Sequence, residues 1–382
     1  MISIMTKNLR EGMVTAQGIY NSRGAAYLVK GSKLNQQYIN RLRDIGIKRV
    51  AVTSMDTLHP APPAPDDIVQ ERTRIGAIQR VYNVFQKATE LSDTVIEPLF
   101  ESTDAIVMDV LSRHENLVQM TDIRLHDDYT FAHSVSVSIL STMLGWLCGF
   151  DKKDLMTLAL GGMLHDVGKI SIPSDVLNKP SSLNDAEFDM IRHHPIVGRE
   201  RLSHLHIPQA SLISAIAYEH HEHMNGRGYP RHIKGNAINL FARIAEVADV
   251  YDALTSERSY KRSYKPHTAY KIMTKLSPGQ FDEDLLQLFF QNVAIFPVGT
   301  VMKTKLGYTI VKEVTPGQTQ APVVCLFANE KQQPLETPRI VLLSNFPSSV
   351  IESVLDDQEL LTLSYRMHMD PATLLTDDGI TE

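Results

Sequence analysis

Histidine is concentrated in the middle of this chain, and that distribution constrains the fold more than any other feature of the sequence. Of 15 histidines, 12 lie between residues 126 and 267. His165 and Asp166 stand side by side at the end of an apolar segment, and Gly168 can turn the chain just after them. Because neighbouring residues on a helix point about 100° apart, this pair can share a centre only from different directions. The fold therefore has to bring polar side chains that are distant in sequence to one point.

Seven histidine and aspartate side chains predict a centre that binds two metal ions. The first set offers nitrogen and oxygen donors from separate helices: His133, His165, Asp166 and Asp249. The second set consists of histidines alone: His194, His220 and His221. If Asp166 gives one carboxylate oxygen to each set, two ions a few ångströms apart satisfy both. Ions about 3.5–4 Å apart can hold an in-line nucleophile and stabilise the leaving oxygen of a phosphoryl transfer.

The donor types limit the identity of the ions without fixing it. With several imidazoles, carboxylates and no thiolate, iron, manganese, zinc, nickel and cobalt are all compatible, and we favour iron or manganese. Any one of the seven side chains could be an ordinary polar residue at a helix end. This interpretation explains the ordered set of seven poorly. A purely structural helical protein is disfavoured, because burying these groups without a metal would cost several kcal/mol.

Positively charged residues near the predicted centre fit a phosphate substrate. Lys169 comes shortly after the bridging aspartate, and Arg258 and Lys261 follow the helix that carries Asp249. A guanidinium can hold two phosphate oxygens, whereas an ammonium acts as a point charge. The alternative is a solvated basic turn, which is the better interpretation for Arg262.

A glycine-rich turn lies in the sequence between His221 and Asp249. Residues 225–230 read Asn-Gly-Arg-Gly-Tyr-Pro. The two glycines allow close approach of the backbone, and Tyr229 offers a face on which a base could stack. An ordinary turn is the alternative interpretation.

Composition and charge are ordinary for a globular protein. Hydrophobic residues make up 43% and charged residues 21%, and the net charge of −6 argues against a binder of nucleic-acid polymers. The only two cysteines, Cys148 and Cys325, favour a reducing compartment and therefore a cytoplasmic protein. The start of the sequence lacks the apolar run of a signal peptide, and the most apolar segment, 139–150, is shorter than the roughly 20 residues of a membrane span.

Changes in composition divide the chain into five regions. Residues 1–56 resemble a small accessory or regulatory module, and a proline-rich linker follows over 57–67. Residues 68–126 are expected to form a helical lead-in, with a coiled-coil dimer arm as the alternative. The helical core domain covers 127–291, and 292–382 form a small β appendage with an acidic tail. The predicted fold class is mainly α, with a small N-terminal α/β module and a small C-terminal β appendage.

Periodicity and end signals predict individual elements. Asp151 can cap the helix that ends at His165, and Asn184 with Glu187 resembles a capping box for the helix that carries His194. Expected strands cover 24–30, 48–52, 300–305, 308–314 and 321–328, and further helices cover 35–45, 208–221 and 239–254. Acidic residues of the tail are expected to be solvated: Asp356, Asp357, Asp377 and Asp378.

Taken together and in order, these residues resemble the HD-GYP family of the HD phosphohydrolase superfamily. The matching segments are 129–134, 165–169, 194–198, 220–222, 228–230, 249–254 and 258–261. The resemblance implies an all-helical, metal-dependent domain. It also implies a phosphodiesterase that hydrolyses the bacterial second messenger cyclic di-GMP to the linear dinucleotide pGpG, to GMP or to both.

The resemblance assigns roles to individual residues. Asp166 would bridge the metals, and Asp166 and Lys169 are the expected catalytic residues. The expected substrate-binding residues are Lys169, Tyr229, Asp252, Arg258 and Lys261. Some members carry a glutamate one helical turn before the first histidine and hold a third metal; this chain has Tyr129 there, so we expect two metals. Asn225 replaces a usual acidic residue, which alters the loop but no expected ligand.

Other functions are also compatible with these residues. The same site could belong to a non-catalytic receptor for cyclic di-GMP. It could also catalyse nucleoside triphosphate hydrolysis or di-iron oxygenation, but residues 228–230 and 258–261 argue against these two reactions. Besides cyclic di-GMP, the expected partners are a diguanylate cyclase with a GGDEF domain or another signalling protein, and a homodimer is compatible. A mixed cyclic dinucleotide is an open alternative substrate.

Overall fold

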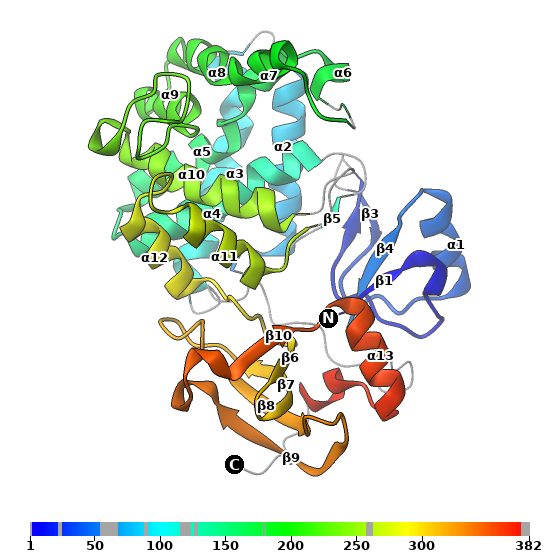
Figure 1. Cartoon of the computed structure of the whole chain (residues 1–382). Coiled ribbons are helices and arrows are strands. Elements are labelled where there is room, and N and C mark those ends of the chain that lie inside the picture. Colours follow the sequence, from blue (N-terminus) through cyan, green and yellow to red (C-terminus); the bar gives the residue numbers. More distant parts are fainter. Residues whose placement is uncertain are drawn as a thin grey trace.

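Residues 2–21, 25–53, 68–87, 91–114, 124–125, 129–177, 179, 181–256 and 263–375 are described by a computed structural model. They form a helical domain and, beside it, a smaller unit with strands that is built from both ends of the chain (Figure 1). The predicted fold class, mainly α with small mixed and β-rich parts, is confirmed.

The helical domain is a bundle in which α4 (Tyr129–Leu147) lies against both α5 (Lys152–Leu164) and α10 (Leu240–Thr255). The remaining helices are α2 (Glu71–Gln86), α3 (Asp93–Ser112), α6 (Ser174–Leu177), α7 (Asp185–Arg192), α8 (His194–Ser203), α9 (Ala210–Glu219), α11 (Pro266–Leu276) and α12 (Glu283–Asn292). The short 3-10 helices η4 (Val167–Ser171) and η5 (Gly235–Ala237) connect some of them.

Helix α4 is apolar because it runs through the inside of this bundle. Val135, Ile139 and Met143 are fully buried. Helix α5 approaches α4 closely at Gly162, where a β-carbon would lie 2.6 Å from the Ser138 α-carbon. The contact holds the C-terminal end of α5 against α4. Within the described parts of the chain, no helix is long and apolar enough to cross a bilayer.

Side-chain caps fix where helices α5 and α7 begin. Asp151 accepts a hydrogen bond from a backbone N–H of the first turn of α5 (2.9 Å), and Asn184 and Glu187 form the expected capping box of α7. Helix α7 ends at Arg192, however, and His194 is the first residue of α8. The expectation that one helix carries the capping box and His194 is therefore wrong, because Pro195 at the start of α8 has no backbone N–H that could continue the hydrogen bonds of α7.

The smaller unit contains three sheets. In the N-terminal part, β1 (Ile2–Met5) pairs antiparallel with β4 (Arg49–Val52), and α1 (Gln36–Asp44) precedes β4. A second sheet has the order β3 (Ala26–Leu28), β2 (Ile19–Tyr20), β5 (Arg124–Leu125), with β5 parallel to β2. The helical lead-in predicted over 68–126 is thus formed by α2 and α3 but is wrong at Arg124 and Leu125.

The third sheet is C-terminal and has five strands in the order β10-β6-β7-β8-β9. Neighbouring strands pair antiparallel, with Val301 opposite Ile310 and Ile310 opposite Cys325. The strands are β6 (Val301–Thr304), β7 (Gly307–Glu313), β8 (Val323–Ala328), β9 (Pro334–Leu342) and β10 (Ile351–Val354), and helix α13 (Asp357–Met367) follows. Strands β9 and β10 and helix α13 were not predicted. Short 3-10 helices are η1 (Thr6–Asn8), η6 (Leu343–Asn345), η7 (Ser348–Val350) and η8 (Pro371–Leu375).

The two ends of the chain share one hydrophobic core, which we call the composite core. It contains Ile39 and Leu42 of α1 together with Phe327 of β8 and Leu363 of α13, each at most 3% exposed. Helix α13 also contacts β1, as Figure 1 shows. The predicted regions 1–56 and 292–382 are therefore joined, because their apolar faces cover each other.

The expected solvated tail is structured at its start: Asp356 is exposed as predicted, whereas Asp357 is partly buried. Asp356 accepts hydrogen bonds from two backbone N–H groups of α13, both at 2.8 Å, and is the N-cap of that helix. Asp357 forms an ion pair with Arg49 at 3.0 Å. Asp377 and Asp378, like the proline-rich linker, lie outside the described residues.

The composite core predicts that the two ends of the chain lose structure together. Leu363→Ala should cost about 2–5 kcal/mol and should increase hydrogen exchange in α1 as well as in α13. Hydrogen exchange followed by mass spectrometry measures both helices. The matched control is Leu158→Ala in α5, which should increase exchange in the helical domain instead. An unchanged α1 in Leu363→Ala would contradict a shared core.

Candidate metal centre

Five segments of the helical domain bring the predicted metal ligands to one place. Two ligands come from the inner faces of long helices, and the other five come from the ends of shorter ones or the residues just after. The side chains are His133 (α4), His165 and Asp166 (after α5), His194 (start of α8), His220 and His221 (after α9) and Asp249 (α10). All but His221 are buried. The structure thus brings together all seven predicted side chains.

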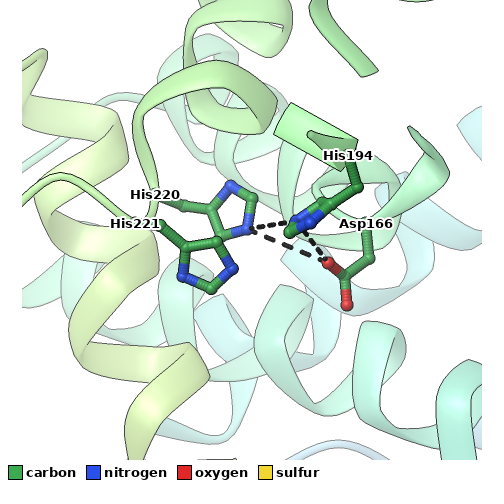
Figure 2. A group of neighbouring side chains, drawn as sticks. All are labelled: Asp166, His194, His220 and His221. Carbon is green, nitrogen blue, oxygen red and sulfur yellow. Dashed lines mark hydrogen bonds and ion pairs between the residues drawn. The ribbon is translucent and has the colours of Figure 1, made fainter. Parts of the chain in front are cut away.

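Asp166 lies at the centre of this group, and its two carboxylate oxygens face different histidines. Its Oδ1 lies 3.2 Å from His194 Nε2 and 3.8 Å from His220 Nε2. Its Oδ2 lies 3.2 Å from His165 Nε2 and 3.9 Å from His133 Nε2. Figure 2 shows the Asp166 carboxylate opposite the rings of His194 and His220. One carboxylate therefore contacts both predicted sets.

The potential ligand atoms form compact groups. Donor atoms within 4.8 Å of one another come from three combinations: Asp166, His194, His220 and His221; His133, His165 and Asp166; and His165, His220 and Asp249. Asp249 Oδ1 also lies 3.0 Å from His133 Nε2, and its Oδ2 lies 4.0 Å from His221 Nδ1. These donors can hold a divalent metal ion.

Hydrogen bonds at the outer nitrogens orient four of the imidazoles. A carbonyl oxygen can only accept, so a ring Nδ1 that contacts one carries the proton and leaves the Nε2 lone pair for a metal. The pairs are His165 with Gly162 O (2.7 Å), His194 with Ile191 O (2.7 Å) and His220 with Ile216 O and Ala217 O (both 3.1 Å). The fourth, His133, contacts a carboxylate, Asp252 Oδ2, at 2.7 Å.

Two buried polar atoms support the fit to a metal. His165 Nε2 and Asp166 Oδ1 are inaccessible to solvent and make no hydrogen bond. Leaving a buried polar group unsatisfied costs about 1–3 kcal/mol. A divalent ion would satisfy both atoms, since a neutral imidazole nitrogen and a carboxylate oxygen are ordinary ligands of such ions.

The two aspartates stay ionised despite their burial. Burial raises the pKa of Asp166, but the charges of His165 and Lys169 and the contacts with two histidines lower it well below its usual range. The pKa of Asp249 is also lowered, because the contact and charge of His133 outweigh burial. Both carboxylates are therefore ready to bind a cation.

The histidines differ in their proton affinity. Burial lowers the pKa of His220, and it lowers the pKa of His221 to about 3. Burial lowers the pKa of His133 too, but the contacts with Asp249 and Asp252 outweigh it and raise the pKa to about 9. Without an ion, His133 is therefore a cation between two carboxylates, whereas His220 and His221 are neutral.

Gly168 allows the turn after Asp166 to lie against α8. A β-carbon at Gly168 would lie 2.0 Å from the His194 carbonyl oxygen and 2.6 Å from the Gly198 backbone nitrogen. Only glycine permits this approach. It brings His194 to the Asp166 carboxylate. Lys169 follows in the same turn and donates a hydrogen bond to Asp166 Oδ2 (2.5 Å), with its side chain 24% exposed.

The loop after His221 is fixed from inside by Glu222. This fully buried carboxylate accepts hydrogen bonds from the backbone N–H groups of Arg231 (2.5 Å) and Ile233 (3.1 Å). Gly228 lies against the loop's own start, since a β-carbon there would be 2.3 Å from the His221 carbonyl oxygen. Glu222 belongs to one of the segments that carry the family resemblance, but its burial cannot be predicted from the sequence.

Tyr229 lies beside the centre rather than apart from it. Its ring centroid is 4.7 Å from that of His221, and its backbone N–H donates to the His221 carbonyl oxygen at 2.9 Å. Burial, with the nearby charges of Asp166 and Asp249, raises the pKa of the Tyr229 hydroxyl above its usual value. The Tyr229 ring therefore supports His221, and its stacking on a base stays a prediction.

The remaining substrate-binding predictions have different outcomes. Asp252 is buried, with a carboxylate that contacts His133 Nδ1 and accepts from Ser256 Oγ at 3.0 Å. This contact can orient His133, and the predicted place of Asp252 beside the substrate stays a prediction. The spacing of three residues from Asp249 could have suggested this role. Arg258 and Lys261 lie outside the described residues.

The fold and the site together define a class of protein. A family model described as an HD domain matches residues 106–285, which include all seven side chains. Residues 106–285 therefore match an HD domain, and the resemblance predicted from the sequence is confirmed.

Individual known proteins are similar over different lengths. A Pseudomonas aeruginosa protein named cyclic di-GMP phosphodiesterase is 29% identical over 301 residues, 76% of this chain and 72% of that protein. A Vibrio cholerae protein named 3'3'-cGAMP-specific phosphodiesterase 1 is 34% identical over 165 residues, 43% of this chain and 38% of that protein. A solved structure of a HDG"Y"P protein from Bdellovibrio bacteriovorus is 19% identical, with a TM-score of 0.49, over 75% of this chain and 97% of that one.

The raised pKa of His133 predicts that metal binding releases a proton. Because that pKa is about 9 without an ion, His133 is protonated at pH 7.5 and a metal at its Nε2 must displace the proton. Metal affinity should therefore rise about tenfold per pH unit up to that pKa. Titration calorimetry in two buffers of different ionisation enthalpy measures the release. In His133→Asn the release should disappear; equal heats in both buffers for the native protein would contradict the prediction.

The contact of Asp252 with His133 makes a second prediction. Asp252→Asn keeps the shape but loses the charge that orients His133, so metal affinity or activity should fall about 10- to 100-fold. Metal titration and turnover measure this. The control is Asp175→Asn in α6, an exposed carboxylate outside the centre, which should change neither quantity. Equal metal affinity and turnover in the native protein and Asp252→Asn would assign Asp252 no part in the centre.

Proposed function

We propose that this chain is a metal-dependent phosphodiesterase that hydrolyses cyclic di-GMP to pGpG, GMP or both. The observation that carries the proposal is the position of Asp166, whose two carboxylate oxygens face two groups of imidazoles. The HD domain and similar proteins named cyclic di-GMP phosphodiesterases support it. Such an arrangement suits a dinuclear centre for phosphoryl transfer.

The proposed centre holds two divalent ions. The first would be held by His133, His165, Asp166 and Asp249, and the second by Asp166, His194, His220 and His221. Iron or manganese is the favoured metal, because the donors are imidazole and carboxylate without thiolate. When bound, the ions supply an activated water nucleophile and stabilise charge on the phosphoryl oxygens. Tyr129 cannot readily supply the carboxylate that a third ion would need.

The protein's own residues prepare this reaction. Asp166 keeps a negative charge between the two sets, and the outer hydrogen bonds fix the direction of the imidazoles. Lys169, partly exposed beside Asp166, places an ammonium where it can neutralise charge that develops on the phosphate. We retain Arg258 and Lys261 as further phosphate-binding residues, since they follow the helix that carries Asp249.

A mixed cyclic dinucleotide is the second candidate substrate. It is favoured by the similarity to Vibrio cholerae proteins named 3'3'-cGAMP-specific phosphodiesterases, at 30–34% identity. A non-catalytic receptor is not favoured, because the similar proteins are named phosphodiesterases.

Partners and location are part of the same proposal. A diguanylate cyclase with a GGDEF domain would make the substrate, and we retain it and a homodimer as predicted partners. We also retain a cytoplasmic location, since a chain with only two cysteines, Cys148 and Cys325, fits a reducing compartment.

Metal analysis of anaerobically purified protein, paired with chromatography of the products, tests the proposed activity. The native protein should contain two ions per chain and convert cyclic di-GMP to pGpG or GMP. Asp166→Asn should lose metal and more than about 100-fold in turnover, since a direct ligand matters more than a residue behind it. Asp175→Asn is the matched control and should keep both. Fully metallated native protein that binds cyclic di-GMP tightly without product would favour the receptor.

A further inference from the structure

Arg192 is a positively charged residue at the edge of the metal centre that sequence analysis did not single out. It is the last residue of α7, two positions before His194. Its guanidinium carbon lies 5.2 Å from the ring centroid of Phe188 and 5.2 Å from that of Tyr229. Tyr229 in turn lies against His221. Arg192 is therefore separated from a proposed metal ligand by one aromatic ring.

The two rings hold the guanidinium without neutralising it. An aromatic face attracts a guanidinium and aligns its plane. Among the described residues, no carboxylate forms an ion pair with Arg192 and no acceptor binds its buried Nε–H. Arg192 is only partly buried, so part of the residue stays accessible to a ligand. Arg192 thus keeps its hydrogen-bonding capacity for something else.

Its charge acts on the same side of the centre as the second proposed ion. The Arg192 guanidinium carbon is 5.2 Å from the centroid of the Tyr229 ring, and that ring lies 4.7 Å from the ring of His221, a proposed ligand of the second ion. Lys169, by contrast, binds the Oδ2 atom of Asp166, which faces His133 and His165. The two cations therefore contact different residues of the centre, Asp166 and Tyr229.

We propose that Arg192 is a substrate-recognition residue that binds the second phosphodiester of a cyclic dinucleotide, the one that is not being cleaved. A cyclic dinucleotide carries two phosphodiesters in one ring, so when one lies at the metal ions the other needs a separate cation. A guanidinium can donate two parallel hydrogen bonds to phosphate oxygens. Phe188, 46% exposed, leaves this edge open to the solvent. The inference rests on the proposed function.

Substitution of Arg192 tests this role on cyclic di-GMP. Arg192→Ala should raise the KM about 10- to 100-fold, the loss expected for a hydrogen bond to a charged group. Arg192→Lys should recover only part of it, since lysine cannot form the planar fork. The matched control is Arg199→Ala, because Arg199 lies over Tyr218 at 4.4 Å in the same kind of contact; its KM should stay unchanged.

Two further readouts separate recognition from support of the metal centre. Metal content and hydrolysis of bis(p-nitrophenyl) phosphate, which has a single phosphodiester, should be the same in Arg192→Ala and the native protein. Parallel loss of metal, or of bis(p-nitrophenyl) phosphate hydrolysis, would make Arg192 a support for His194 or Tyr229 and overturn the proposal. An unchanged KM for cyclic di-GMP would overturn it as well.

A comparison of ligands distinguishes phosphate from base recognition. With 3'3'-cGAMP and cyclic di-AMP, Arg192→Ala should lose the same factor in affinity, because the phosphodiesters are the same. A loss confined to guanine-containing ligands would overturn the phosphate assignment. If the native protein does not hydrolyse cyclic di-GMP, the proposed function fails, and the dissociation constant of the metallated native protein and of Arg192→Ala then decides the role of Arg192.

Discussion

The burial of one carboxylate among four imidazoles is the constraint on which the rest of the helical domain depends. Asp166 is 1% exposed and has an oxygen that no hydrogen bond satisfies. A buried charge is tolerated only where other charges or a metal compensate it. The segments around it must therefore approach one another closely, and the contact at Gly168 allows the turn after Asp166 to lie against α8.

Without an ion, protons supply part of this compensation. The His133 imidazolium lies between Asp249 and Asp252, and the Lys169 ammonium binds Asp166. Both cations occupy positions next to oxygens that a metal would bind. The same electrostatic field that would attract divalent ions thus raises the proton affinity of His133, so protons compete with the metal at that ligand.

The sequence was sufficient to predict which histidine and aspartate side chains lie together, but not which residues support them. His165, His194 and Asp166 are polar residues at the ends of apolar helices, so their order along the chain indicated a shared centre. The contact of Asp252 with His133 could not be predicted in the same way. It depends on how α10 packs against α4, which the sequence does not specify. Arg192 was missed for a similar reason: its two aromatic contacts come from α7 and from a loop more than thirty residues away.

The fold of the ends was predicted element by element, but their association was not. Periodicity identifies α1 and β6 to β8, yet it contains no signal for which apolar face covers which, and α1 and α13 are more than three hundred residues apart. Asp357 shows the consequence. It pairs with Arg49 at 3.0 Å and lies 3.8 Å from Lys265, which also donates to the Leu355 carbonyl oxygen. Lys265 directly precedes α11, so any rotation of the composite core against the helical domain must break bonds close to the segment that carries Arg258 and Lys261.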